Sequence, residues 1–201
     1  MLVQGIKSRP VYTGITFDPM AKRHIFALEA QGATALIEQV KSAGEGEITK
    51  ADILYVATAA APSAYDQKLA TLKPNDLWVA PTIPVLLNRL NVVLGTAHMG
   101  TRVYISGTEG FIGQTMQVAL GHGIDFNSLK TEHRGSEARR VQCVHCKGIT
   151  DNVRTSPYAC SHCGLSLLVR DHYSRRLAAF QGVCIDAETP GTAPAPEVLF
   201  P

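Results

Sequence analysis

The sequence predicts an α/β fold in which helices cover both faces of a parallel sheet, with a small metal-binding ribbon domain at the C-terminal side. Short apolar runs alternate with stretches of helical spacing from residue 24 to residue 132, which is typical of a parallel sheet. Two Cys-x-x-Cys pairs follow between Cys143 and Cys163 and predict the ribbon. Ligands of such sheets bind beyond the carboxyl ends of the strands, here at the loops 29–34, 58–63 and 107–111.

Each expected strand is a short apolar run. The runs lie at 25–28, 53–56, 77–79, 102–106 and 129–132. Four helices are expected between them: one whose apolar spacing begins at Ala33 and ends near Gly44, a short one over 62–72 that suits Pro62 in its first turn, one that ends at Gly95, and one stopped by Gly121.

Composition divides the chain into five expected segments. They are an arm (1–20), the sheet domain (21–134), a polar hinge (135–140), the four-cysteine metal ribbon (141–186) and a Pro/Ala-rich tail (187–201). In the ribbon, a strand from Leu165 to Val169 is expected to precede a short helix or turn through Phe180. The tail is not expected to fold alone, and its final apolar residues, Val198 to Phe200, are candidates for docking on a partner.

The composition also indicates a location. Hydrophobic residues make up 45% of the chain, the first ten residues lack the apolar stretch of a leader, and the apolar run 53–62 is too short to span a membrane. We therefore expect a cytoplasmic protein with reduced thiols and no membrane partner. The fifth cysteine, Cys184, is expected to be a buried or idle thiol.

Charge is distributed unevenly along the chain. Residues 1–129 contain ten Lys/Arg and ten Asp/Glu, whereas residues 130–180 contain nine against four, a net charge of +5. The metal ribbon is thus the basic part, and charge alone fits either a nucleic acid or an acidic protein surface.

Cys143, Cys146, Cys160 and Cys163 are the expected ligands of one metal ion. Each Cys-x-x-Cys makes a tight turn, and two turns separated by thirteen residues supply four thiolates for a tetrahedral site. Gly164 follows the second pair, where the missing Cβ is expected to relieve crowding. Two disulfides are the alternative, which a reducing compartment disfavours. Four thiolates suit zinc or a single rubredoxin-like iron, and the ligands do not separate the two.

No catalytic site and no cofactor site of the chain's own is expected. His145 and His162 lie inside the Cys-x-x-Cys turns and are expected to be polar loop residues, because four cysteines are available as ligands. His172 beside Asp171 is expected to be a surface pair or a partner contact. No Ser-His-Asp order, paired carboxylates or phosphate loop is present.

Residues 21–134 resemble the nicotinamide-nucleotide lobe of ferredoxin-reductase-type flavoenzymes. That lobe opens with a Gly-Gly-x-Gly-x-Thr-Pro turn, of which this chain keeps Gly32 and Thr34 in the stretch 29–35. Its later Tyr-x-Cys-Gly-Pro-x-Gly-Phe-Met pattern corresponds to 104–112, with Ser106 in place of the cysteine. Glu29 places a carboxylate near the expected phosphates. The resemblance therefore implies a degenerate lobe kept as a scaffold.

Such a lobe followed by a four-cysteine module resembles the small-subunit family of the multicomponent dimethylamine monooxygenases. The most specific parts are the four cysteines and the run from Asp171 to Arg176. This resemblance implies a complex in which a haem subunit demethylates a secondary amine. It also implies a separate reductase subunit that carries flavin and an iron–sulfur cluster and delivers electrons from NADPH. The haem, the flavin and the cluster are expected on these partner subunits only.

Two functions compete at this point. The first is a non-catalytic or electron-relaying subunit of that redox complex. The second is a nucleic-acid-binding zinc-ribbon protein, which the same arginines favour. Tyr158 and Tyr173 are the only aromatic residues among those charges before Phe180, too few for an obvious stacking platform, so a nucleic-acid partner is disfavoured.

Overall fold

The computed structural model describes residues 8–43, 46–58 and 64–201, which form two compact units. The α/β unit is Tyr12–Gly135. The ribbon unit combines Met1–Val11, described from Ser8 onward, with Ser136–Pro201. Within these described ranges, no helix is long and apolar enough to cross a membrane. The predicted helix start at Pro62 and most of the predicted loop 58–63 lie outside the described residues.

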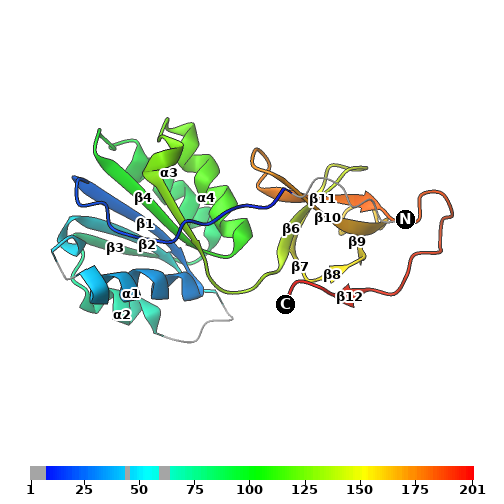
Figure 1. Cartoon of the computed structure of the whole chain (residues 1–201), viewed down its shortest axis with the longest axis horizontal. Coiled ribbons are helices and arrows are strands. Elements are labelled where there is room, and N and C mark those ends of the chain that lie inside the picture. The colour runs from blue at the N-terminus through cyan, green and yellow to red at the C-terminus, as the bar shows by residue number, and fades with distance from the viewer. Residues whose placement is uncertain (1–7, 44–45, 59–63) are drawn as a thin grey trace. The chain divides into compact units, whose positions relative to one another are not determined.

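A parallel sheet forms the centre of the α/β unit (Figure 1). Its strands are β1 (Arg23–Glu29), β2 (Ala51–Val56), β3 (Asp76–Ala80), β4 (Thr101–Gly107) and β5 (Leu129–His133). They lie in the order β3-β2-β1-β4-β5, and every pairing is parallel. The predicted sheet is confirmed. Its strand order reverses between β1 and β4, and this switch point is where sheets of this kind bind ligands.

Helices cover both faces of this sheet, as predicted (Figure 1). One face packs against α1 (Ala33–Ala43) and α2 (Tyr65–Thr71), and the other against α3 (Ile83–Leu94) and α4 (Glu109–Gly121). Short 3-10 turns lie at η1 (Ala30–Gly32), η2 (Ile48–Lys50) and η3 (Phe126–Ser128). Because each strand sends alternate apolar side chains to opposite faces, the sheet separates two buried apolar cores.

Part of the expected N-terminal arm belongs to the α/β unit. Ile15 and Phe17 are buried, and the Phe17 ring makes edge contacts with the rings of Phe26 and Tyr104. The Gly14 N–H donates to the Thr131 carbonyl at 2.9 Å. The chain entering β1 is therefore packed where an arm was expected, because it shields aromatic side chains of β1 and β4 from water.

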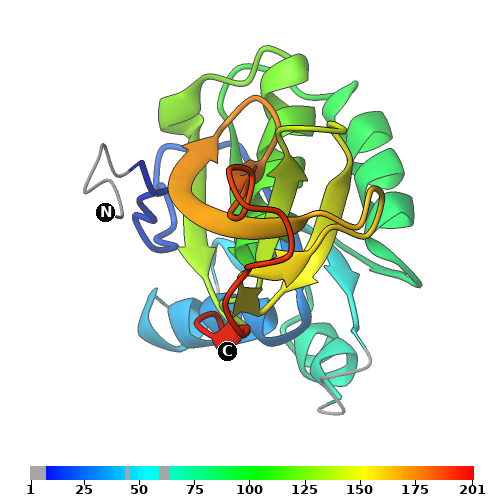
Figure 2. The ribbon, with the colours of Figure 1, turned by 90° about the vertical axis from the view of Figure 1, so that its right-hand side faces the viewer.

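The ribbon unit contains a mixed five-stranded sheet, in the order β7-β6-β11-β10-β9. Its strands are β6 (Arg139–Cys143), β7 (Ile149–Val153), β9 (Tyr158–Ala159), β10 (Ser166–Ser174) and β11 (Ala179–Cys184). A second pair joins β8 (Thr155–Ser156) to β12 (Glu197–Val198). Figure 2 shows the curve of β10 (orange), whose register against β11 shifts between Arg170 and Tyr173.

Three expectations about this unit differ from the structure. Strand β6 begins at Arg139, inside the expected hinge. Phe180 lies in strand β11, not in a helix or turn, because β11 pairs on both sides, with β10 and β6. The tail is ordered without a partner, because Glu197 and Val198 pair with β8 and Phe200 is buried in the core of the ribbon unit.

The tail is held by a group that we call the Arg139 clamp: Arg139, Phe180, Phe200 and Asp171. The buried Arg139 guanidinium lies 4.0 Å from the Phe180 ring centroid and 4.1 Å from that of Phe200. Asp171 lies 2.8 Å from Arg139 and also accepts a hydrogen bond from Arg9 at 2.6 Å. A buried guanidinium needs such a partner, and its flat faces suit aromatic rings.

Candidate metal centre

The four predicted ligands come from two turns that we call knuckles. The first knuckle, Cys143–Cys146, continues from the end of β6, and the second, Cys160–Cys163, lies between β9 and β10. Each knuckle closes with a backbone hydrogen bond of 3.0 Å to the carbonyl of its first cysteine, from Lys147 and from Gly164. The two knuckles thus repeat one local geometry.

Gly164 is needed for a reason other than the one expected. A Cβ at this position would meet no atom within 4 Å, so crowding does not explain the glycine. Its φ of +75° lies in the left-handed region, which glycine adopts without strain. Lys147 occupies the matching position of the first knuckle with a φ of +63°. The sequence signal was therefore right about the turn and wrong about its cause.

The two knuckles bring the four sulfurs together. Cys143 Sγ lies 3.8 Å from Cys163 Sγ, Cys146 Sγ lies 3.7 Å from Cys160 Sγ, and all four atoms lie within 4.8 Å of one another. A tetrahedron with metal–sulfur bonds of about 2.3 Å has edges of about 3.8 Å. All five cysteines are free thiols, so the disulfide alternative does not apply. The donor set fits one tetrahedral ion.

The surroundings of the sulfurs stabilise the thiolate form of one cysteine more than that of another. Burial raises the pKa of the Cys160 thiol, but backbone N–H groups of Cys163 and His162 donate to its sulfur and, with neighbouring thiols, lower the pKa to about 6. A backbone N–H of Leu165 lowers the pKa of Cys163, but burial and the other ligand sulfurs outweigh it and raise the pKa to about 12. One thiolate forms readily and the next is opposed by it. A bound cation would remove that opposition.

The other candidate residues make polar contacts or lie exposed at the surface. His145 is exposed, and the His162 ring hydrogen-bonds the Ile149 carbonyl at 2.9 Å. Asp171 pairs with Arg9 and Arg139, so its neighbour His172 is not part of an acid–base pair with it. Cys184 is half-buried and donates to Asp186 at 3.3 Å.

Sequence reasoning missed the contacts that join the second knuckle to the start of β7. Besides the bond from His162, the Thr150 and Ser161 hydroxyls lie 2.9 Å apart. Tyr158 was also missed as a core residue beside Cys143 and Cys160, and burial raises its pKa to about 12. The tyrosine falls two residues before a predicted ligand, which is the only signal that could have placed it there.

The switch point of the α/β unit is filled by the chain itself. Glu29, at the end of β1, is buried, and its carboxylate accepts from the Thr108 N–H at 2.8 Å and from the Thr108 hydroxyl at 2.7 Å. Thr108 precedes α4, so this carboxylate sits where the N-terminus of a helix attracts an anion. A Cβ on Gly107 would lie 2.7 Å from the Glu29 Cβ, and one on Gly32 would lie 2.1 Å from the Ser106 carbonyl oxygen. Both glycines serve tight packing at this point.

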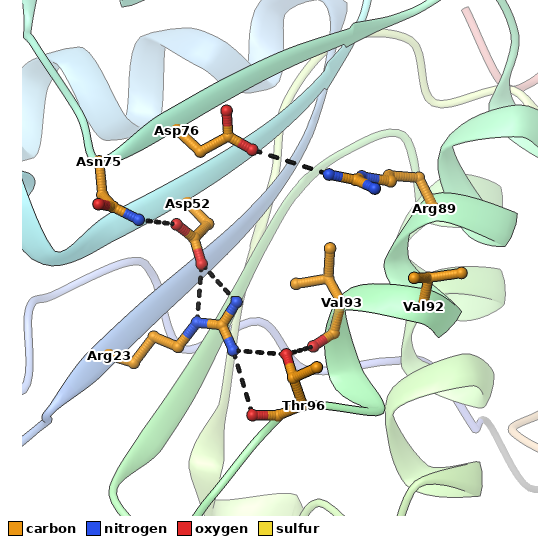
Figure 3. Close-up of a pocket in the computed structure, with 8 residues that line it drawn as sticks. All are labelled: Arg23, Asp52, Asn75, Asp76, Arg89, Val92, Val93 and Thr96. Carbon is orange, nitrogen blue, oxygen red and sulfur yellow. Dashed lines mark hydrogen bonds and ion pairs between the residues drawn. The ribbon is translucent and has the colours of Figure 1, made fainter.

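A pocket of about 320 Å³ lies at the opposite end of the sheet (Figure 3). Arg23 binds Asp52 through two nitrogens at 2.7 and 2.6 Å, and Asn75 donates to the same carboxylate at 2.6 Å. Across the pocket Arg89 faces Asp76 at 4.0 Å. The charges of the lining residues balance one another, so the pocket offers no net charge to a ligand.

Comparison with known proteins covers nearly the whole chain. Residues 4–129 match the family described as "Dimethylamine monooxygenase subunit DmmA-like, N-terminal domain", and residues 140–183 match its C-terminal domain. A curated relative is the "Heme-dependent oxidative N-demethylase delta subunit" of Ectopseudomonas mendocina (strain ymp), with 26% identity over 183 residues, 91% of each chain.

Two solved structures are similar to part of the chain. An intact type IV self-sufficient cytochrome P450 monooxygenase has a TM-score of 0.45 and 24% identity, over 67% of this chain and 19% of that chain. Phthalate dioxygenase reductase has a TM-score of 0.45 and 16% identity, over 68% of this chain and 46% of that chain. The chain thus spans less than half the length of either solved protein.

Proposed function

Because the chain belongs to the DmmA-like family of dimethylamine monooxygenase subunits, we propose that it is the small subunit of a haem-containing, NADPH-dependent complex that demethylates a secondary amine. The family agrees with the resemblance seen in the sequence, and the curated relative is a subunit of a haem-dependent N-demethylase. In this proposal the haem subunit carries out the oxidation. A reductase subunit with flavin and an iron–sulfur cluster receives the electrons of NADPH.

The four cysteines are proposed to hold one metal ion. The observation that carries this proposal is the approach of the four sulfurs, with spacings of 3.7 and 3.8 Å that fit a tetrahedral edge. Zinc would brace the ribbon unit, because structural zinc contributes folding free energy of about 10 kcal/mol. A single iron would also brace it and would add the ability to exchange one electron.

The α/β unit is proposed to act as a scaffold and not as a coenzyme site. A dinucleotide would bring phosphates to the switch point, where the Glu29 carboxylate already uses the Thr108 N–H. The two negative groups would repel each other in a buried site. Electron entry from NADPH is therefore assigned to the partner reductase subunit.

The ribbon unit is proposed to dock on acidic partner surfaces, because Met1–Val11 and Ser136–Pro201 together contain nine Lys/Arg against six Asp/Glu, a net charge of +3. The nucleic-acid alternative would need exposed tyrosine rings on which bases could stack, and the two tyrosines of this region do not supply them. Tyr158 is 8% exposed, and the Tyr173 ring packs edge-on against Phe180. Neither ring is displayed for stacking on bases.

Purification of the chain together with its partner subunits tests this proposal. We expect co-purification with a haem subunit and a flavin subunit at moderate salt, and one metal ion per chain by elemental analysis. A red chain with one iron indicates an electron relay, and a colourless chain with one zinc indicates a brace. Absence of any metal contradicts the four-cysteine site. Failure to associate with the two subunits, combined with DNA binding that weakens steeply with salt, favours the alternative.

A further inference from the structure

The second knuckle is tied to the segment that follows the first knuckle by side chains that are not ligands. His162, in the second knuckle, hydrogen-bonds through Nε2 to the carbonyl of Ile149, which follows the first knuckle, at 2.9 Å. Since a carbonyl can only accept, Nε2 of His162 carries the hydrogen and donates it. A second tie joins the hydroxyls of Thr150 and Ser161 at 2.9 Å.

The His162 ring rests directly on the backbone of Gly148. A Cβ at Gly148 would lie 2.4 Å from both Cγ and Cδ2 of His162, a distance that no side chain can occupy beside that ring. The Gly148 carbonyl also accepts from the N–H of Cys143 at 2.9 Å. The ring is therefore seated on the same short segment that holds the first metal ligand.

The His162 backbone is part of the site as well. Its N–H donates to the sulfur of Cys160. Fixing the ring against Gly148 and Ile149 therefore fixes the direction of a hydrogen bond to a ligand sulfur. With Nε2 donating to the Ile149 carbonyl, that nitrogen is not directed at the ion as a ligand.

We propose that His162 is a positioning residue of the four-cysteine centre, which ties the second knuckle to the segment that follows the first knuckle and slows the release of the metal. This rests on the proposed binding of a metal by the four cysteines. Release requires at least one knuckle to swing away from the other, and the tie from His162 must break before it does. The His162 ring packs against Gly148, and any side chain at residue 148 would displace the ring.

His145 provides a matched control, because it occupies the same place in the first knuckle that His162 occupies in the second. Both are the third residue of a Cys-x-His-Cys sequence, and both are exposed. The structure shows a side-chain tie for His162 and none for His145 among the described residues.

The test measures zinc release from the full-length chain to a chromogenic chelator in excess. His162→Ala is expected to release zinc about tenfold faster than the wild type, which is the effect of losing one hydrogen bond. His162→Gln, whose amide can donate to the same carbonyl, is expected to recover most of this difference. His145→Ala is expected to stay within twofold of the wild type.

A double variant tests the contact between the His162 ring and Gly148 specifically. Gly148→Ala is expected to accelerate release as well, because the new Cβ displaces the ring. Once the ring is absent that Cβ has nothing to displace, so Gly148→Ala combined with His162→Ala is expected to release zinc no faster than His162→Ala alone. Fluorescence of the single tryptophan, Trp78, confirms that the α/β unit remains folded in each variant.

The absorption spectrum of the cobalt-substituted protein reports the ligands separately. We expect the thiolate-to-cobalt bands of His162→Ala to match those of the wild type, since no ligand is lost. Equal release rates for His162→Ala, His145→Ala and the wild type would overturn the proposal, as would loss of thiolate bands in His162→Ala. A wild-type chain that binds neither zinc nor iron would instead overturn the metal site itself.

Discussion

Phe200 is expected to stabilise the ribbon unit although it lies in the Pro/Ala-rich tail. Its ring is 9% exposed and covers one face of the Arg139 guanidinium at 4.1 Å. Replacing a buried phenylalanine by alanine costs about 3–5 kcal/mol, and a desolvated cation–π contact contributes about 1–2 kcal/mol of such a loss. Because the ring is at the edge of the core, we expect Phe200→Ala to destabilise the unit by about 3 kcal/mol.

Hydrogen exchange followed by mass spectrometry measures this loss segment by segment. A loss of about 3 kcal/mol corresponds to roughly a hundredfold faster exchange of the most protected amides. We expect that change in peptides from β6 and β11, and none in peptides from β1 and β2 of the α/β unit. Trp78 fluorescence should likewise be unchanged.

The neighbouring residue supplies the control for Phe200. Leu199 is 52% exposed, and the N–H groups of both residues donate to the Arg154 carbonyl at 3.0 Å. Leu199→Ala therefore keeps the backbone contacts and removes an exposed side chain, with an expected cost below about 0.5 kcal/mol. If Phe200→Ala exchanges like the wild type, or if Leu199→Ala is equally damaging, the clamp does not hold the tail.

Three further predictions concern Cys160, Asp171 and Glu29. Cys160→Ser is expected to lose the metal and loosen the ribbon unit while β1 and β2 keep their protection; an unchanged metal content would remove the four-thiolate site. Burial raises the pKa of Asp171, but Arg9 and Arg139 outweigh it and hold that pKa below its usual value. The carboxylate therefore contributes stability above about pH 4 that is lost as the pH falls through its lowered pKa. Asp171→Asn should cost about 3 kcal/mol at pH 7, because it leaves a buried guanidinium without its partner, and should flatten the acid limb of the stability curve. Equal acid limbs in the two proteins would count against this pair. Glu29→Gly is expected to raise the affinity for NADPH severalfold in a titration of the purified chain, and equal affinities would leave the repulsion at the switch point without support.

The elements that depend on local pattern were predictable from the sequence. Strand β1 was expected over 25–28 and spans Arg23–Glu29, because its continuous apolar run marks a strand buried on both faces. The approach of the four cysteines to one another was predictable for a similar reason, since two residues of spacing set each turn and two such turns supply four sulfurs. The repeated turn of Lys147 and Gly164 follows from the same short-range geometry.

The features that sequence reasoning missed depend on residues far apart in the chain. Leu177 to Phe180 is a short apolar stretch that suits either a helix or a strand, and only its pairing with β6 and β10 decides for β11. Phe200 sits in a segment whose composition indicates disorder, and its burial depends on a guanidinium at residue 139. Glu29 was expected to repel phosphates, but its acceptance of the Thr108 N–H depends on the approach of β4 to β1.

The ribbon unit is built from both sides of the α/β unit along the chain. Ser8 donates to the Asp171 carbonyl at 2.9 Å and accepts from the N–H of Tyr173 at 3.0 Å. On the ribosome, residue 8 emerges well before β10, and the whole parallel sheet is synthesised in the interval. The ribbon unit is consequently completed only after the parallel sheet has been synthesised, and a fragment that starts at residue 136 would lack the contacts of Ser8 with β10.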